Sequence, residues 1–168
     1  MNTETKPKKE SKLDIDSNYD LQLVSTLSPA LRWVLTLPIA FIAMFAVQVG
    51  FGTLVKLINS NLPMGEIVNT IMLSTVMLAK YAIFVIAATS TAPLTRNKKF
   101  IAAIAAAFIG ALLCVGGTAI SLSLSVSIDK TMLISTFVAS ILGLLLGVWK
   151  VRSATSKPLT EENKASQL

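Results

Sequence analysis

Histidine is absent from this chain, and cysteine occurs once, at Cys114. Histidine is the commonest general base and the commonest metal ligand in proteins, so its absence argues against both kinds of chemistry. A single cysteine cannot form a disulfide within the chain or a thiolate metal cluster made by one chain. We therefore expect no metal site, no cofactor and no redox centre.

Charged residues are also scarce, at 14% of the chain against about 25% in ordinary soluble domains. The sequence has no membrane-embedded pair of acidic residues, no serine or cysteine beside a base, and no phosphate-binding glycine loop. These absences predict that the protein is not an enzyme and has no catalytic residues. The net charge of +6 is better explained by orientation in a membrane than by binding to nucleic acid.

Apolar residues, in contrast, make up 53% of the chain, and its mean hydropathy is +0.68. A helix needs about 20 apolar residues to cross the hydrocarbon core of a bilayer. Four segments are long enough, at about residues 33–57, 67–88, 100–120 and 132–148. The sequence therefore predicts an all-α integral membrane protein, a four-transmembrane-helix antiparallel bundle surrounded by lipid.

The chain has room for one membrane domain, residues 28–152, between polar tails at residues 1–27 and 153–168. The first tail mixes lysines with acidic residues and has few apolar side chains, a composition that cannot offset the entropy lost on ordering. Ser28 and Pro29 suit the start of the first membrane helix, as its cap and its first helical residue. We expect both tails to be flexible.

Polar and apolar residues alternate strictly at residues 121–127, which locally is typical of a strand. An isolated strand in lipid would leave backbone groups without hydrogen bonds. We therefore favour a fraying helix end followed by an extended turn, with the strand as the alternative.

The positive charges predict which side of the membrane each end faces. Of the 15 lysines and arginines, all except Lys56, Lys80 and Lys130 lie before the first span, after the fourth span, or between the second and third spans. Positive residues are retained on the cytoplasmic side, and tryptophans such as Trp33 and Trp149 settle at the interface. We expect both termini in the cytoplasm. Small size, short loops and no cleavable signal at the start favour the inner membrane of a bacterium.

Lys80 is the one charged residue near the middle of a span, where a charge costs about 2.5–3.5 kcal/mol on insertion scales. One interpretation is that its side chain reaches toward the interface. The other is functional, because Glu66 and Asp129 lie too far along the helices to pair with it. Gln48 on the first span and Asn69 on the second complete a hypothetical polar seam that binds an anionic group or a carboxylate from another protein.

Small residues follow one face of the third span, including Gly110, Cys114 and Gly117, and Gly143 and Gly147 form a GxxxG pattern in the fourth. Such residues let helices approach closely. We expect them to pack spans three and four together within one bundle, with self-association as the alternative. Cys114 fits this packing role better than that of a nucleophile, since no base lies beside it.

Three functions remain open at this stage. The first is an accessory or assembly subunit of a membrane complex, whose partner membrane protein supplies the group that Lys80 lacks. The second is a homo-oligomeric transporter or channel for a small or anionic solute that passes the polar seam. The third is a membrane immunity or stress-protection protein that binds an intruder.

Overall fold

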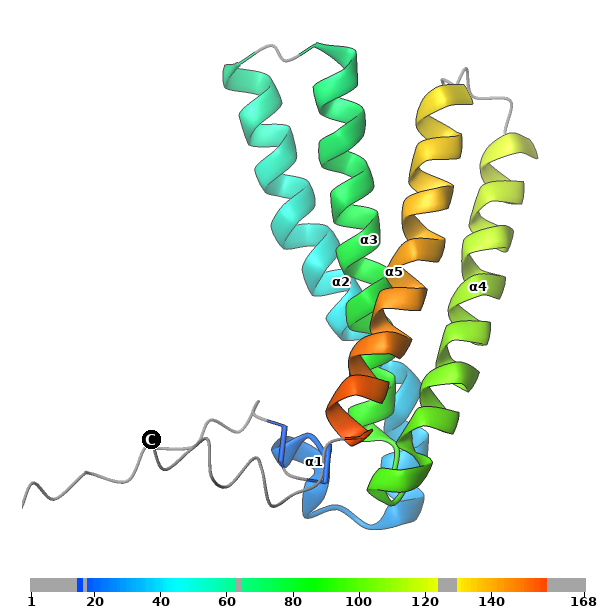
Figure 1. Cartoon of the computed structure of the whole chain (residues 1–168). Helices are drawn as coiled ribbons and strands as arrows, with labels where there is room; N and C mark the ends of the chain where they lie inside the picture. Colours follow the sequence, from blue (N-terminus) through cyan, green and yellow to red (C-terminus); the bar gives the residue numbers. More distant parts are fainter. Residues whose placement is uncertain (1–14, 17, 63–64, 124–129, 157–168) are drawn as a thin grey trace, which may run out of the picture.

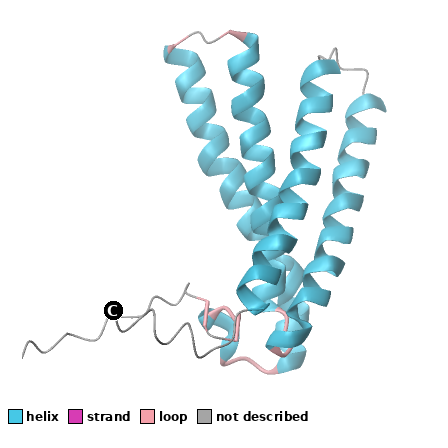
Figure 2. Ribbon diagram, in the orientation of Figure 1, coloured by secondary structure: helices cyan, strands magenta, loops and turns pink. Residues whose placement is uncertain are grey.

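The computed structural model of this chain describes residues 15–16, 18–62, 65–123 and 130–156. It contains four helices long and apolar enough to cross a membrane (Figures 1 and 2), which confirms the predicted number of long apolar helices. They are α2 (Pro29–Asn61), α3 (Glu66–Thr91), α4 (Lys99–Ser123) and α5 (Lys130–Ser156).

Two short helices complete the described structure, α1 (Gln22–Ser25) and the 3-10 turn η1 (Arg96–Lys98). Outside the helices, the described residues pair as β-structure only in one isolated bridge, between Ile15 and Leu21. The all-α prediction is therefore confirmed for this part of the chain. Of the segment 121–127, residues up to Ser123 belong to α4, and the rest lie outside the described residues.

The helices are longer than the apolar runs that predicted them. Helix α2 begins at Pro29, as expected, although the side chain of Ser28 makes no capping hydrogen bond. Helix α5 continues to Ser156, beyond the predicted span end at residue 148 and into the segment assigned to the second tail. The guanidinium of Arg96 donates to the carbonyl oxygens of Ala154 (2.7 Å) and Thr155 (3.5 Å), which helps satisfy acceptors of the last turn.

The helices form two pairs, α2 beside α3 and α4 beside α5, and the pairs meet at one end and diverge toward the other (Figure 1). We call the end that carries α1 and η1 the terminal end. The opposite end, where α2 and α4 finish and α3 and α5 begin, is the loop end.

Close packing between α3 and α5 joins the two pairs. A Cβ atom added at Gly143 would lie 3.0 Å from the Cα and carbonyl carbon of Leu78, and one at Gly147 would lie 2.8 Å from Cβ of Val85 and 2.9 Å from the carbonyl oxygen of Ala82. The glycines are therefore needed because the backbones approach each other here. The GxxxG pattern packs within the chain, as expected, but against α3 rather than the expected α4.

The hydrophobic core lies toward the terminal end. Its largest fully buried side chain is Phe84, which is 0% exposed and meets Phe41 edge-on at 5.7 Å between ring centroids. The buried residue nearest the loop end is Val76 on α3, Cys114 on α4 and Ala139 on α5. The described parts of these three helices nearer the loop end, residues 66–75, 115–123 and 130–138, contain no buried residue.

Candidate functional site

Lys80 lies on α3, four residues beyond the point where burial begins. Its ammonium nitrogen is 3.4 Å from Oε1 of Gln48 on α2 and 3.7 Å from the sulfur of Met77. It also lies 5.5 Å from the ring centroid of Tyr81. The side chain is thus partly buried among groups that carry no charge, two of which attract a cation through a dipole or a π-face.

A cavity of about 230 Å³ adjoins Lys80 between α3, α4 and α5. Apolar residues such as Leu133 and Phe137 form part of its wall. Its polar lining consists of Lys80, Tyr81, Cys114, Thr118, Ser121, Thr136 and Ser140. The cavity therefore lies at the level where the buried core of α3, α4 and α5 ends.

The hydroxyl groups of the cavity donate their protons to their own helices. Thr118, Ser121, Thr136 and Ser140 each donate to the carbonyl oxygen four residues earlier, over 2.7–2.9 Å. Since each hydroxyl has one proton, only its lone pairs remain for a ligand. The ammonium of Lys80 can therefore donate to a small anionic or hydrogen-bond-accepting group, whereas the oxygens of these four hydroxyls act as acceptors.

The structure brings together two of the three residues of the predicted polar seam. Lys80 and Gln48 are in contact, whereas the side-chain oxygen of Asn69 accepts a hydrogen bond from the amide of Asn59 (2.9 Å) nearer the loop end. Within the described ranges, the ion pairs all involve Asp20 and none reaches Lys80. Glu66 begins α3, about 20 Å away along the axis, and Asp129 lies outside the described residues.

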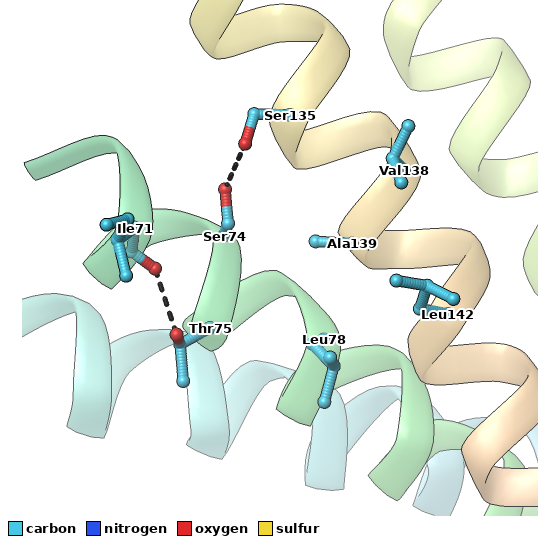
Figure 3. A pocket seen from close by; sticks show the side chains of 8 residues that line it. All are labelled: Ile71, Ser74, Thr75, Leu78, Ser135, Val138, Ala139 and Leu142. Carbon is cyan, nitrogen blue, oxygen red and sulfur yellow. Dashed lines mark hydrogen bonds between the residues drawn. The ribbon is translucent and has the colours of Figure 1, made fainter. Parts of the chain in front are cut away.

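A second groove, of about 280 Å³, separates α3 from α5 near the loop end (Figure 3). The hydroxyl oxygens of Ser74 and Ser135 lie 2.9 Å apart across it, and Thr75 donates to the carbonyl oxygen of Ile71. The remaining lining is apolar, from Leu78, Val138, Ala139 and Leu142. Because its polar groups bond to each other or to backbone, this groove is a helix contact rather than a ligand site.

The other small residues predicted to pack helices differ in their surroundings. A Cβ at Gly110 would meet the side chains of Leu144 on α5 (2.5 Å) and Phe84 on α3 (3.5 Å). Cys114 is 5% exposed and also lines the Lys80 cavity. Gly117 has open space around it, with no heavy atom within 4 Å of an added Cβ. The small-residue face therefore packs only over the part of α4 nearer the terminal end.

Sequence reasoning missed a cluster of charges at the terminal end. The carboxylate of Asp20 accepts hydrogen bonds from the guanidinium of Arg32 at 2.5 and 3.3 Å, and from the ammonium of Lys99 at 2.6 Å. Arg32 is 8% exposed and Lys99 is 0% exposed. The sequence presents these cations only as flanking charges that orient the spans, and nothing in their spacing signals that they share one carboxylate.

The same two cations also satisfy the end of α3. The Lys99 ammonium donates to the carbonyl oxygens of Thr89 (3.0 Å) and Ala92 (2.7 Å), and Nε of Arg32 donates to that of Thr91 (3.1 Å). Cations placed at a helix C-terminus compensate the negative end of the helix dipole. The cluster therefore ties the N-terminal segment, α2, the end of α3 and the start of α4 together.

The cluster sets the charge state of Asp20. Burial by itself would raise the pKa of this carboxyl, but the hydrogen bonds and positive charges of Arg32 and Lys99 outweigh it and hold the pKa below its usual value. Asp20 is thus ionised at neutral pH. One negative and two positive charges leave the cluster with a net positive charge.

Residues 15–16 and 18–27 fold against the bundle, although they lie in the range assigned to the first tail. The side chain of Asp16 accepts hydrogen bonds from the amides of Asn18 (2.9 Å) and Asp20 (2.8 Å), while Tyr19 adopts a positive φ of 64°. Tyr19 and Val24 are buried, at 8% and 2% exposure, and the amide of Leu21 donates to the Ser90 carbonyl oxygen. Composition predicted a tail because it does not register these tertiary contacts.

Burial also raises the pKa of the Tyr19 phenol, so this residue stays neutral at physiological pH.

In the described part of the chain, no group of three or more histidine, cysteine, aspartate or glutamate residues could hold a metal ion. The chain matches no protein-family model, no curated protein and no solved structure. Function must therefore be argued from the charges and cavities of the chain itself.

Proposed function

We propose that this protein is a non-enzymatic accessory or assembly subunit of a larger membrane complex, in which a partner helix brings an acidic side chain to Lys80. The observation that carries the proposal is the ammonium of Lys80, whose recorded contacts in the described structure are with the neutral groups of Gln48, Met77 and Tyr81. An intramembrane charge normally pairs with another group, because its isolation in lipid is costly. A carboxylate would supply that pair.

The distribution of burial supports a partner protein. The described residues of α3, α4 and α5 nearer the loop end contain no buried residue, and the two helix pairs diverge there (Figure 1). Helices in lipid gain stability from van der Waals packing against other helices. A partner helix beside Lys80 would add this packing at the level where the chain's own core ends.

The proposal includes an orientation. We infer an antiparallel bundle in a bacterial inner membrane, with both termini in the cytoplasm. The support is the excess of lysine and arginine among residues of the terminal end, against Lys56 and Lys130 near the loop end. In this orientation, the Lys80 cavity lies on the side of the core that faces the outer half of the bilayer.

The decisive experiment is co-purification from native membranes in mild detergent, with Lys80→Met and Lys80→Arg compared with the unchanged protein. Methionine keeps the length of the side chain and removes its charge, whereas arginine retains the charge. We expect Lys80→Met to lose co-purifying subunits by about tenfold or more, since a lost charge-assisted contact is worth about 1.5–3 kcal/mol, and Lys80→Arg to retain part of them.

Lys56→Met is the matched control, because Lys56 is an exposed lysine near the loop end of α2. It removes the same charge from a position outside the cavity and should leave the co-purified proteins unchanged. Quantitative mass spectrometry would measure each subunit relative to the tagged chain. If the Lys80→Met protein accumulated normally and kept every partner, the accessory role of Lys80 would be refuted.

The cavity itself favours a second candidate, a homo-oligomeric channel or transporter for a small anion. Its volume of about 230 Å³ accommodates a small solute, and its lining carries the ammonium of Lys80, which attracts an anion. Sealed vesicles that contain the purified protein would then release trapped chloride or acetate. Lys80→Met should abolish this release, whereas Lys56→Met should not. Vesicles that stay tight, together with subunits that co-purify from native membranes and are lost from the Lys80→Met protein, would favour the accessory subunit.

A further inference from the structure

An apolar groove of about 210 Å³ lies between α2 and α4, in the part of the bundle nearer the terminal end. Trp33, Thr36 and Leu37 form its α2 side. Its α4 side consists of Ala102, Ala105, Ala106 and Ile109. Ala88 of α3 and Ala92, the residue after the end of α3, complete the lining. Alanine at most of these positions leaves room that a longer side chain would fill.

The groove runs along the helices. Its α4 residues recur every three or four positions, so they share one face, and Ala102 and Ile109 are separated by about 10 Å along the axis. A groove of this direction on a membrane helix is parallel to the acyl chains of the surrounding lipid. Because it opens beside a hydrophobic span, its occupant is apolar along this length.

Positive charge gathers at the end of the groove nearer η1. Lys98 is exposed and lies one helical turn before Ala102, on the same face of the chain. The buried cluster of Asp20, Arg32 and Lys99, next to Trp33 in sequence, has a net positive charge. Asp16 is the other described carboxylate at this end. An anionic group is therefore favoured beside this end of the groove.

We propose that the α2–α4 groove binds an anionic phospholipid, with one acyl chain over the alanines of α4 and the phosphate beside Lys98. Trp33 borders the same end, where an indole ring settles at the boundary between headgroups and hydrocarbon. The charge at one end and the apolar length behind it match the two parts of a single lipid. The site shares no residue with the Lys80 cavity, so it stands whether or not Lys80 binds a partner.

Tryptophan fluorescence tests the site in the full chain. Trp149→Phe leaves Trp33 as the sole tryptophan, and the protein is placed in vesicles that contain phosphatidylglycerol or phosphatidylcholine brominated near the carboxyl end of the acyl chain. We expect brominated phosphatidylglycerol to quench Trp33 more strongly than brominated phosphatidylcholine. Trp33→Phe, which leaves only Trp149, should show little difference between the two lipids.

Two variants locate the binding. Ala105→Phe fills the groove from an exposed position of α4 and should remove the preference, whereas Ala119→Phe, at an exposed position near the loop end of α4, should not. Lys98→Gln should lower the preference for the anionic lipid about fivefold, the equivalent of one positive charge near an anionic surface.

Three results would overturn the proposal. The first is equal quenching of Trp33 by both lipids, and the second is a preference that Ala105→Phe and Lys98→Gln leave unchanged. The third is relief of quenching by soluble glycerol phosphate, because the headgroup alone would then bind without an acyl chain in the groove.

Discussion

At the scale of single residues, Asp20 holds the terminal end together because its carboxylate contacts two buried cations, Arg32 and Lys99. Removing one partner of a buried ion pair leaves a charge without compensation. We expect Asp20→Asn to lower the free energy of unfolding by about 3 kcal/mol, as measured by denaturation in mixed micelles. Glu66→Gln, which neutralises an exposed carboxylate at the start of α3, should have little effect.

The pKa of Asp20 predicts how stability changes with pH. Because the folded-state pKa lies below the ordinary value of 3.8, the stabilisation is fully present above that value and is lost as pH falls through the folded-state pKa. Thermal unfolding of the unchanged protein should therefore occur at lower temperature in this acidic range. Asp20→Asn should show a shallower decline, and an identical decline would contradict the assignment.

Sequence reasoning identified a contact between single residues where their depth along two neighbouring helices was enough to bring them together. Counting along antiparallel spans placed Gln48 at the level of Lys80, and these side chains are in contact. The same counting placed Asn69 on the helical face of Lys80, but its side-chain oxygen accepts a hydrogen bond from Asn59 instead. Lys99 and Asp20 are 79 residues apart in the chain, and a pair so distant depends on tertiary approach that no local pattern reveals.

At the scale of the helices, the contact between α3 and α5 depends on Gly143 and Gly147. A methyl group at Gly143 would lie 3.0 Å from backbone atoms of Leu78, which cannot move aside as a side chain can. We expect Gly143→Ala to destabilise the protein by about 1–3 kcal/mol, the usual cost of overpacking. Gly116→Ala is the control, because nothing lies within 4 Å of its added Cβ.

Unfolding in mixed micelles would measure both glycine variants. Equal stability of the Gly143→Ala protein and its Gly116→Ala control would mean that α3 and α5 do not pack closely at this point. A loss of dimer with unchanged monomer stability would instead assign the GxxxG pattern to self-association.

The apolar runs predicted that the four membrane helices exist and roughly where they lie, because lipid requires long apolar helices. They did not predict where the helices end. The last turns of α3 and α5 are polar, and cations from elsewhere in the chain bond their carbonyl groups, as Lys99 does at Thr89 and Arg96 does at Ala154. Hydropathy carries no information about such partners.

At the scale of the whole molecule, the proposed orientation can be tested with single cysteines in a Cys114→Ser background. Asn61→Cys marks the loop end and Ser153→Cys the terminal end of the bundle. In sealed spheroplasts, a membrane-impermeant maleimide should label residue 61 and reach residue 153 only after permeabilisation. The reverse pattern would place the termini outside and refute the charge argument.

The divergence of the two helix pairs has a consequence for how the molecule responds to its surroundings. Gly143 and Gly147 bring α5 close to α3, and the ion cluster joins the helices at the terminal end, whereas the described residues of α3, α4 and α5 nearer the loop end contain no buried residue. We therefore expect the angle between the pairs to change more readily than their contacts at the terminal end. Bilayer thickness, lateral pressure or an inserted helix would alter that angle first, before any secondary structure is lost.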